Sequence, residues 1–133
     1  MTPLPTDSDS PLEGRWQMLR AELAGDEAPA LLSSGTVLEL GPGIYTVRFG
    51  GEISDRGTYE LGGTLEARTM ILKGESGTNA GRTIPCIYQL VGDGLRVCYG
   101  LDSVAPTDFA TAPGQQRYLA TYRRQPSSVG KTI

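Results

Sequence analysis

The sequence predicts an all-β domain, an eight-stranded antiparallel up-and-down barrel with one short helix. The 18 glycines and 9 prolines divide the 133 residues into short apolar stretches, which is typical of strands joined by tight turns. Within the stretches, apolar and polar residues alternate, as a sheet with one buried face requires. Eight antiparallel strands expose their edges unless the sheet closes into a barrel, and a two-sheet sandwich is the alternative.

Eight strands are expected in succession, separated by glycine-containing turns. They lie at residues 14–24, 36–40, 43–49, 52–61, 64–73, 82–91, 94–99 and 116–124. The turns are expected at Gly41-Pro42, Gly50-Gly51, Gly62-Gly63 and the VGDG sequence of residues 91–94. Glycine suits these hairpin turns because it tolerates positive φ. We therefore expect successive strands to be antiparallel neighbours.

A helix of one or two turns fits only between the first two strands, at residues 26–34. Pro29 suits the first turn of a helix, the following ALL sequence can cover a core, and Gly35 can end the helix. Two roles are open for this helix. It is either a lid over one barrel end or a simple connector.

The strands at 43–49 and 52–61 predict a hairpin with an inward arginine. A two-residue turn at 50–51 places Arg56 opposite Tyr45, on the apolar face of the first strand. An inward arginine can pair with the carboxylate of a ligand. A salt bridge with a neighbouring acidic residue is the alternative that needs no ligand.

The strands at 82–91 and 94–99 predict a second hairpin, whose register separates the two cysteines. A tight turn at VGDG places Cys86 opposite Tyr99 and turns Cys98 to the other face. A disulfide is therefore disfavoured, although a one-residue bulge would reverse this conclusion. The spacing is not CxxC, so we expect small buried hydrophobic side chains rather than zinc ligands.

Two longer glycine-rich segments, at 73–82 and 100–115, are expected to be loops. The SGTNAGRT sequence at 76–83 has some features of a phosphate-binding loop. However, Ser76 stands at the first glycine position, Arg82 stands at the lysine position, and a strand follows instead of a helix. We therefore expect a hairpin loop at a barrel mouth rather than a nucleotide site.

The composition argues against several classes of function. The net charge is -3, with 12 basic residues against 15 acidic ones, so nucleic-acid binding is not expected. Histidine is absent, and no two carboxylates have a spacing that suits acid and base roles, so we expect no enzyme activity, cofactor or metal. No apolar run approaches the roughly 20 residues that span a bilayer. We expect a monomer or a homodimer.

The two ends of the chain differ in composition from the middle. Residues 1–11 and 125–133 contain Pro, Ser and Thr with little to bury, which predicts disordered tails around one domain at 12–124. The N-terminus has neither the basic start nor the apolar core of a secretion signal. This predicts a cytoplasmic protein.

Gly14-Arg15-Trp16 resembles the Gly-x-Trp motif of lipocalins. In that family the tryptophan closes the bottom of the barrel, and an arginine of the last strand packs over its ring. The terminal YRR sequence supplies Arg123 or Arg124 as the counterpart. A guanidinium on an indole ring contributes roughly 0.5 to 2 kcal/mol. The resemblance implies a structural role for these residues.

More closely, the chain resembles a bacterial family of small, uncharacterised lipocalin-like domains over about residues 12–124. The likeness is carried by GRWQM at 14–18, GTYEL at 57–61, CIYQLVGDGLRVCYG at 86–100, PTDF at 106–109 and RYLATYRR at 117–124. It implies the fold, and no activity or ligand. Members often follow a secretion signal or lipoprotein leader, which is not expected from the first residues of this sequence. In PTDF, we expect Asp108 to cap backbone amides and Phe109 to lie under the barrel.

Tyrosines that alternate along the strands define two hypotheses for function. In the first, the barrel binds a small hydrophobic or amphipathic molecule in a cavity of at least a few hundred cubic ångströms. The expected lining is Tyr45, Arg56, Tyr59, Tyr88 and Tyr99. In the alternative, side chains fill the barrel, and its surface serves protein interaction or dimerisation without a small-molecule ligand.

Overall fold

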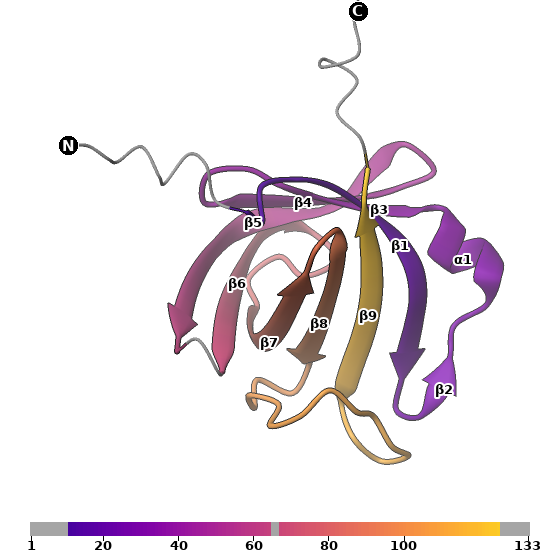
Figure 1. Cartoon of the computed structure of the whole chain (residues 1–133), viewed down its shortest axis with the longest axis vertical. Coiled ribbons are helices and arrows are strands. Elements are labelled where there is room, and N and C mark those ends of the chain that lie inside the picture. Colours follow the sequence, from indigo (N-terminus) through magenta and orange to yellow (C-terminus); the bar gives the residue numbers. More distant parts are fainter. Residues whose placement is uncertain (1–10, 65–66, 126–133) are drawn as a thin grey trace, which may run out of the picture.

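The computed structural model describes residues 11–64 and 67–125, which form a closed eight-stranded antiparallel barrel with one short helix (Figure 1). The barrel strands are β1 (Gly14–Leu23), β3 (Thr36–Leu40), β4 (Ile44–Phe49), β5 (Glu52–Gly63), β6 (Arg68–Gly77), β7 (Thr83–Val91), β8 (Gly94–Gly100) and β9 (Arg117–Arg124). Between β1 and β3 lie a two-residue strand, β2 (Asp26–Glu27), and the helix α1 (Ala30–Ser34). Each barrel strand pairs with the next, and β9 pairs with β1, so the sandwich alternative is wrong. The tails expected at 1–11 and 125–133 lie mostly outside the described residues.

The inward face of the barrel strands carries the hydrophobic core. Because side chains alternate along a strand, every second residue contributes to this core and the residues between them face outward. The largest fully buried side chains are Trp16, Tyr45, Leu12, Met70, Ile84, Leu95, Val97, Cys86 and Cys98. All of them except Cys98 belong to one continuous cluster inside the barrel.

Trp16 closes the end of the barrel at which β1 begins and β9 ends. Its ring is fully buried, and its Nε1 donates a hydrogen bond to Leu12 O at 2.9 Å. The guanidinium of Arg124 lies over the ring, 4.3 Å from its centroid. The expected stacking of a terminal arginine on the tryptophan is therefore confirmed for Arg124. Arg123 is exposed on the outer face.

Gly14 makes room for this arginine. Arg124 donates from Nη1 to Glu13 O at 2.9 Å and from Nη2 to Pro11 O. Gly14 has a φ of +137°, and a Cβ added there would lie 3.1 Å from Nη1 of Arg124. Glycine is thus favoured both by the backbone conformation and by the space that the guanidinium occupies.

The strand positions agree closely with those expected, and the largest difference concerns β6. Gly62 and Gly63, expected to form a turn, are instead paired with Thr69 and Arg68 at the end of β5. A Cβ on Gly63 would lie 2.1 Å from Ala67 O, so glycine permits a close backbone approach there. The chain reverses after these glycines, and β6 begins later than expected.

The helix is shorter than the expected 26–34. The first two residues of that range form β2 instead, so α1 begins after Pro29. Gly35 ends the helix, as the sequence predicted. Leu31 is 80% exposed. The helix lies beside β1 (Figure 1), where Gln17 Nε2 donates to Ser34 O at 3.0 Å. This position favours the connector role over the lid.

Arg56 lies on the outer face of the barrel, which corrects the expected inward arginine. The two-residue turn at 50–51 forms as expected. Beyond it, the pairing of β5 with β4 shifts by one position, leaving Ser54 as an extra residue. Such a shift turns the following side chains to the opposite face. Arg56 consequently pairs with Thr46 and is exposed, while Asp55 is inside and only 5% exposed.

The β7–β8 hairpin has the expected register. Cys86 lies opposite Tyr99 inside the barrel, while Cys98 lies on the outer face beside the backbone of Ala110. Both cysteines are free and buried. Burial raises the pKa of each thiol above its ordinary value. The expectation that the two cysteines do not pair is confirmed.

The segment at 101–116 covers the outside of β8, and PTDF attaches it there. Asp108 Oδ1 lies 2.7 Å from Arg117 Nη1. The Phe109 ring packs against the guanidinium of Arg96, 4.4 Å from its centroid. The expectation for this motif is therefore wrong in detail. Asp108 pairs with an arginine instead of capping amides, and Phe109 lies against the barrel wall instead of under the barrel.

Candidate functional site

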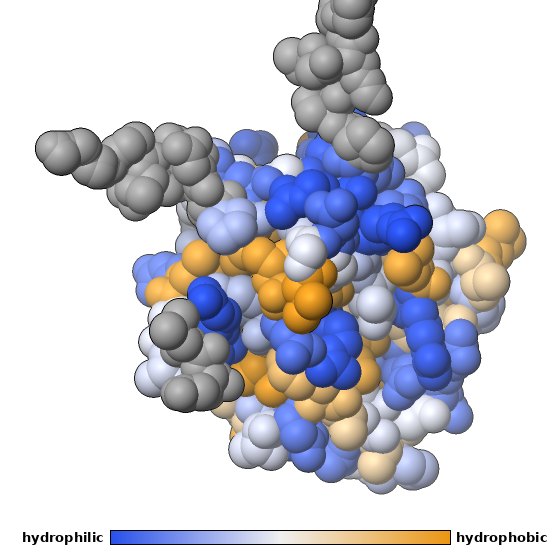
Figure 2. All heavy atoms as spheres, viewed as in Figure 1, coloured by the Kyte–Doolittle hydropathy of each residue, from blue (hydrophilic) through white to orange (hydrophobic). Residues whose placement is uncertain are grey.

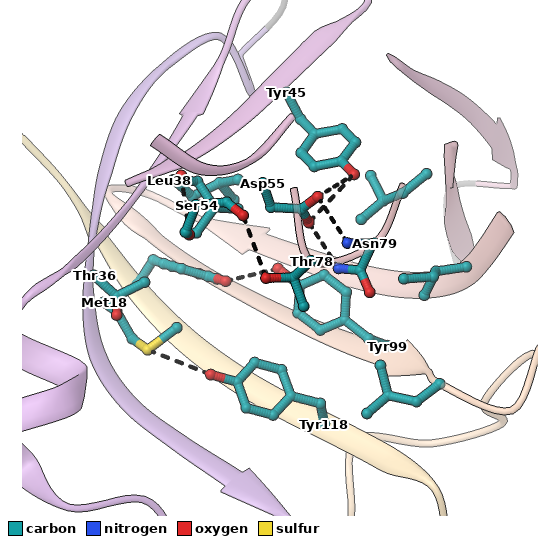
Figure 3. A pocket seen from close by; sticks show the side chains of 15 residues that line it. Met18, Thr36, Leu38, Tyr45, Ser54, Asp55, Thr78, Asn79, Tyr99 and Tyr118 are labelled. Atoms are coloured by element: carbon teal, nitrogen blue, oxygen red, sulfur yellow. Dashed lines mark hydrogen bonds between the residues drawn. The ribbon is translucent and has the colours of Figure 1, made fainter. Parts of the chain in front are cut away.

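A pocket of about 200 Å³ opens into the barrel at the end opposite Trp16 (Figure 3). Inward-facing residues of the strands, together with the loop between β6 and β7, form most of its wall. Its lining residues are Met18, Thr36, Leu38, Tyr45, Val47, Ser54, Asp55, Leu72, Thr78, Asn79, Ile84, Tyr99, Leu101, Tyr118 and Tyr122. The wall is mainly apolar, and one buried carboxylate stands within it.

That carboxylate belongs to Asp55, which receives hydrogen bonds from three donors. Tyr45 Oη lies 3.3 Å from each carboxylate oxygen. Asn79 donates from Nδ2 at 2.7 Å and from its backbone nitrogen at 3.3 Å. Figure 3 shows the three side chains pointing toward one another from β4, β5 and the β6–β7 loop. The extra residue Ser54 is what brings Asp55 to this inner face.

Tyrosine hydroxyls form a second polar group in the pocket. The hydroxyls of Tyr99 and Tyr122 lie 2.6 Å apart and share a hydrogen bond. Burial raises the pKa of both phenols. It also raises the pKa of Tyr45, where the nearby negative charge of Asp55 adds to the effect. These tyrosines therefore act as neutral hydrogen-bonding groups near neutral pH.

A second pocket, of about 380 Å³, adjoins the first. The two pockets share Met18, Thr36 and Tyr118 in their walls. Tyr118 Oη donates to Met18 Sδ at 3.8 Å, so this pair stands between the two spaces. The rest of the second wall is Leu23, Asp26, Glu27, Ala28, Leu32 and Ser33.

The structure brings together only part of the expected lining. Tyr45 and Tyr99 line the pocket. Tyr59 and Tyr88 are buried but do not line it, and Tyr59 Oη donates to Gly41 O at 2.6 Å. These two tyrosines help to fill the barrel. Arg56 lies outside, for the reason given above.

Two residues that the sequence reasoning missed are central to the pocket. In the sequence Asp55 is only the acidic neighbour of Arg56, able to form a salt bridge with it, and the inward turn of Asp55 depends on a bulge. Asn79 belongs to the loop that was expected at a barrel mouth, so its place at the mouth could have been found. Its contact with Asp55 could not have been, because that contact depends on the same register shift.

The described residues show neither a metal centre nor a membrane-spanning helix. Among residues 11–64 and 67–125, no three His, Cys, Asp or Glu side chains are grouped so as to hold a metal ion. In the same part of the chain, no helix has the length and apolar character needed to cross a bilayer.

Comparisons with known proteins give no match. No protein-family model, curated protein or solved structure matches this chain. The structural result is the eight-stranded barrel itself, and the resemblance to lipocalin-like domains stays a prediction.

Proposed function

We propose that this barrel is a non-catalytic binding protein that holds a small amphipathic molecule in the pocket beside Asp55. The carrying observation is the combination of a mainly apolar wall with a few converging polar groups, namely the Asp55 carboxylate, the Asn79 amide and the tyrosine hydroxyls. Ligand pockets are typically built in this way. The interior of an eight-stranded barrel of the lipocalin type can hold one small ligand, so the proposal also agrees with the resemblance in sequence.

The size of the pocket limits the ligand. Pockets for drug-sized molecules measure about 300 to 1,000 Å³, whereas this one measures about 200 Å³. A ligand confined to it is therefore small and compact. The adjoining pocket of about 380 Å³ gives room for a larger substituent only if it displaces the contact between Tyr118 and Met18 that separates the two spaces.

Action through the surface is the second candidate, because buried side chains such as Trp16 and Tyr59 fill part of the barrel and apolar side chains remain outside. Leu31 and Leu32 on α1 are 80% and 49% exposed. On the face shown in Figure 2, however, polar side chains interrupt the apolar areas. Large continuous patches are what mark a stable interface. This face therefore supports the second candidate less strongly than the pocket supports ligand binding.

The test is native mass spectrometry of the protein purified from its own host, with two matched variants. Val47→Phe places a ring in the pocket, whereas Val91→Phe makes the same change at a residue 69% exposed at the other end. We expect a bound small molecule in the wild type and Val91→Phe, and its loss in Val47→Phe. Retention by Val47→Phe would contradict the proposal. A wild-type mass without a bound molecule would also contradict the proposal, provided that phenethyl alcohol, phenethylamine and hydrocinnamate show no saturable binding to the purified protein either.

A further inference from the structure

We propose that the pocket selects a small organic cation, a protonated amine with a compact apolar body, and that Asp55 is its counter-ion. This inference rests on the proposed function and names the class of its ligand. It reverses the polarity expected from the sequence. An inward arginine would have favoured a ligand carboxylate, whereas the inward charged residue is an aspartate.

First, the buried carboxylate of Asp55 has no cationic partner in the described part of the chain. Burying a charge is costly unless an opposite charge or several hydrogen bonds compensate. The ion pairs among residues 11–64 and 67–125 do not include Asp55. Arg82 donates to Asn79 Oδ1 at 3.1 Å, so the Asn79 amide stands between this guanidinium and the carboxylate. Within the described part of the chain, all the donors to Asp55 are neutral.

Second, the carboxylate of Asp55 can accept a further hydrogen bond. An ionised carboxylate offers about four acceptor positions. Tyr45 Oη, Asn79 Nδ2 and the Asn79 backbone nitrogen supply three donors. A further donor can reach the carboxylate from the pocket that Asp55 lines. An ammonium group would supply both this donor and the missing positive charge.

Third, the charged residues in the walls of the two adjoining pockets are all acidic. The charged residues lining the two adjoining pockets are Asp55, Asp26 and Glu27, and no lysine or arginine lines either pocket. Glu27 also lies 3.6 Å from Arg20, outside these walls. A cleft lined by one sign of charge attracts ions of the opposite sign. The pocket therefore favours cations and disfavours fatty acids or other anions.

The remainder of the wall suits the apolar part of such a ligand. Leu38, Val47 and Leu72 supply aliphatic contacts. The aromatic rings of the lining tyrosines attract a cation through their π faces, which favours an ammonium group over a neutral group of the same shape. The ligand expected from this wall is an amine attached to an aryl or small alkyl body.

A purely structural role for Asp55 is the competing explanation. Through Asn79 and the pairing with Gly77, Asp55 also holds the loop between β6 and β7. In that case the carboxylate would stabilise the loop and would not distinguish among ligands. The two explanations differ in what the charge of Asp55 does to ligand selectivity.

The experiment compares three probes of similar shape on the full chain by isothermal titration calorimetry at neutral pH. They are phenethylamine, which is cationic, phenethyl alcohol, which is neutral, and hydrocinnamate, which is anionic. A hydrogen bond to a charged group predicts that the amine binds about 10- to 100-fold more tightly than the alcohol, and that the acid binds most weakly. Equal binding of amine and alcohol would overturn this inference and leave the proposed function standing. No binding of any probe would count against the proposed function itself.

Two variants then separate recognition from structure. Asp55→Asn removes the charge and keeps the shape, and Glu60→Gln makes the same charge change at an exposed position of β5. We expect Asp55→Asn to lose the preference for the amine while its affinity for the alcohol is retained, and Glu60→Gln to behave as the wild type. An equal loss for both probes in a folded Asp55→Asn protein would assign Asp55 a structural role only. If Asp55→Asn does not fold, the three-probe comparison on the wild type decides the question.

Discussion

Arg124, on the last strand, contacts the segment before the first strand at the end of the barrel that Trp16 closes. Its guanidinium lies on Trp16 and donates to the carbonyls of Glu13 and Pro11, which precede β1. Stacking on an indole contributes roughly 0.5 to 2 kcal/mol, and each hydrogen bond from a charged group about 1.5 to 3 kcal/mol. One side chain of the last strand therefore holds the segment before the first strand.

Arg124→Ala is expected to lower the free energy of unfolding by about 2 to 4 kcal/mol, because stacking and both hydrogen bonds are lost together while water solvates the freed carbonyls, which keeps the cost below the sum of the separate contributions. The adjacent Arg123→Ala is the matched control. It removes an exposed arginine from the outer face and should cost less than about 0.5 kcal/mol. Urea unfolding followed by the fluorescence of Trp16, the only tryptophan, measures both. Equal costs for the two variants would refute the role given to Arg124.

At the scale of single residues, the sequence could predict the roles of those residues that belong to a recognisable local pattern. Trp16 follows a glycine at a recognisable spacing, and its arginine stands at the end of the last strand, so their contact could be expected. Asp55 and Arg56 are adjacent, and only the register of β5 decides which of them is inside. Nothing in their own chemistry marks Asp55 as the inward residue.

At the scale of elements, β5 determines the shape of the pocket. Its pairing with β4 shifts beside Val47, and its pairing with β6 shifts between Arg56 and Gly57. A Cβ on Gly57 would lie 2.0 Å from Lys73 O and 2.9 Å from the Cα of Gly74. The backbones of β5 and β6 therefore approach most closely just beyond Asp55, where only glycine fits.

Gly57→Ala is expected to destabilise the protein by about 1 to 3 kcal/mol or more, because two hydrogen-bonded backbones must separate to admit the methyl group. Gly41→Ala is the control. The nearest atom to its added Cβ is Ile44 O at 3.9 Å, so it should fold with nearly unchanged stability. Thermal unfolding followed by far-ultraviolet circular dichroism compares the two. A Gly57→Ala protein as stable as Gly41→Ala would show that the close approach relaxes freely.

Strands and hairpins could be predicted from the sequence because alternation and glycine turns repeat along the chain. The extra residue in β5 could not, since Ser54 carries no glycine or proline signal and begins a run of three polar residues, 54–56, in which no alternation marks the inward face. The same limit explains Gly62 and Gly63, where glycine serves a close approach at a strand end instead of a turn. Glycine marks an unusual backbone position without stating which kind it is.

At the scale of the whole molecule, the barrel has an end closed by packed side chains and an end with a pocket. Trp16, Tyr59 and Leu95 are buried toward the closed end, while Asp55 and Asn79 face the pocket at the other. Closure of the barrel could be predicted from eight antiparallel strands, but the division between the closed end and the pocket depends on side-chain volumes that strand patterns do not specify.

The same interior makes the fold sensitive to alkaline pH. Burial raises the pKa of Tyr45, Tyr59, Tyr99, Tyr118 and Tyr122 above the ordinary value of 10.0. As pH rises through 10, the unfolded chain loses these phenol protons first, so the folded state binds more protons than the unfolded state. The free energy of unfolding must then fall with pH. Each such group lowers it by up to about 1.4 kcal/mol per pH unit while the folded phenol stays protonated.

We therefore expect stability to be lost progressively above about pH 10, with these five tyrosines ionising only as the barrel unfolds. Urea midpoints measured from neutral pH to pH 11 give the loss of stability. Ultraviolet absorbance of tyrosinate, recorded beside far-ultraviolet circular dichroism, shows whether ionisation and unfolding coincide. If the tyrosines ionised near pH 10 while the circular dichroism of the barrel persisted, these hydroxyls would be open to solvent. The burial of Tyr99 and Tyr122 would then be contradicted.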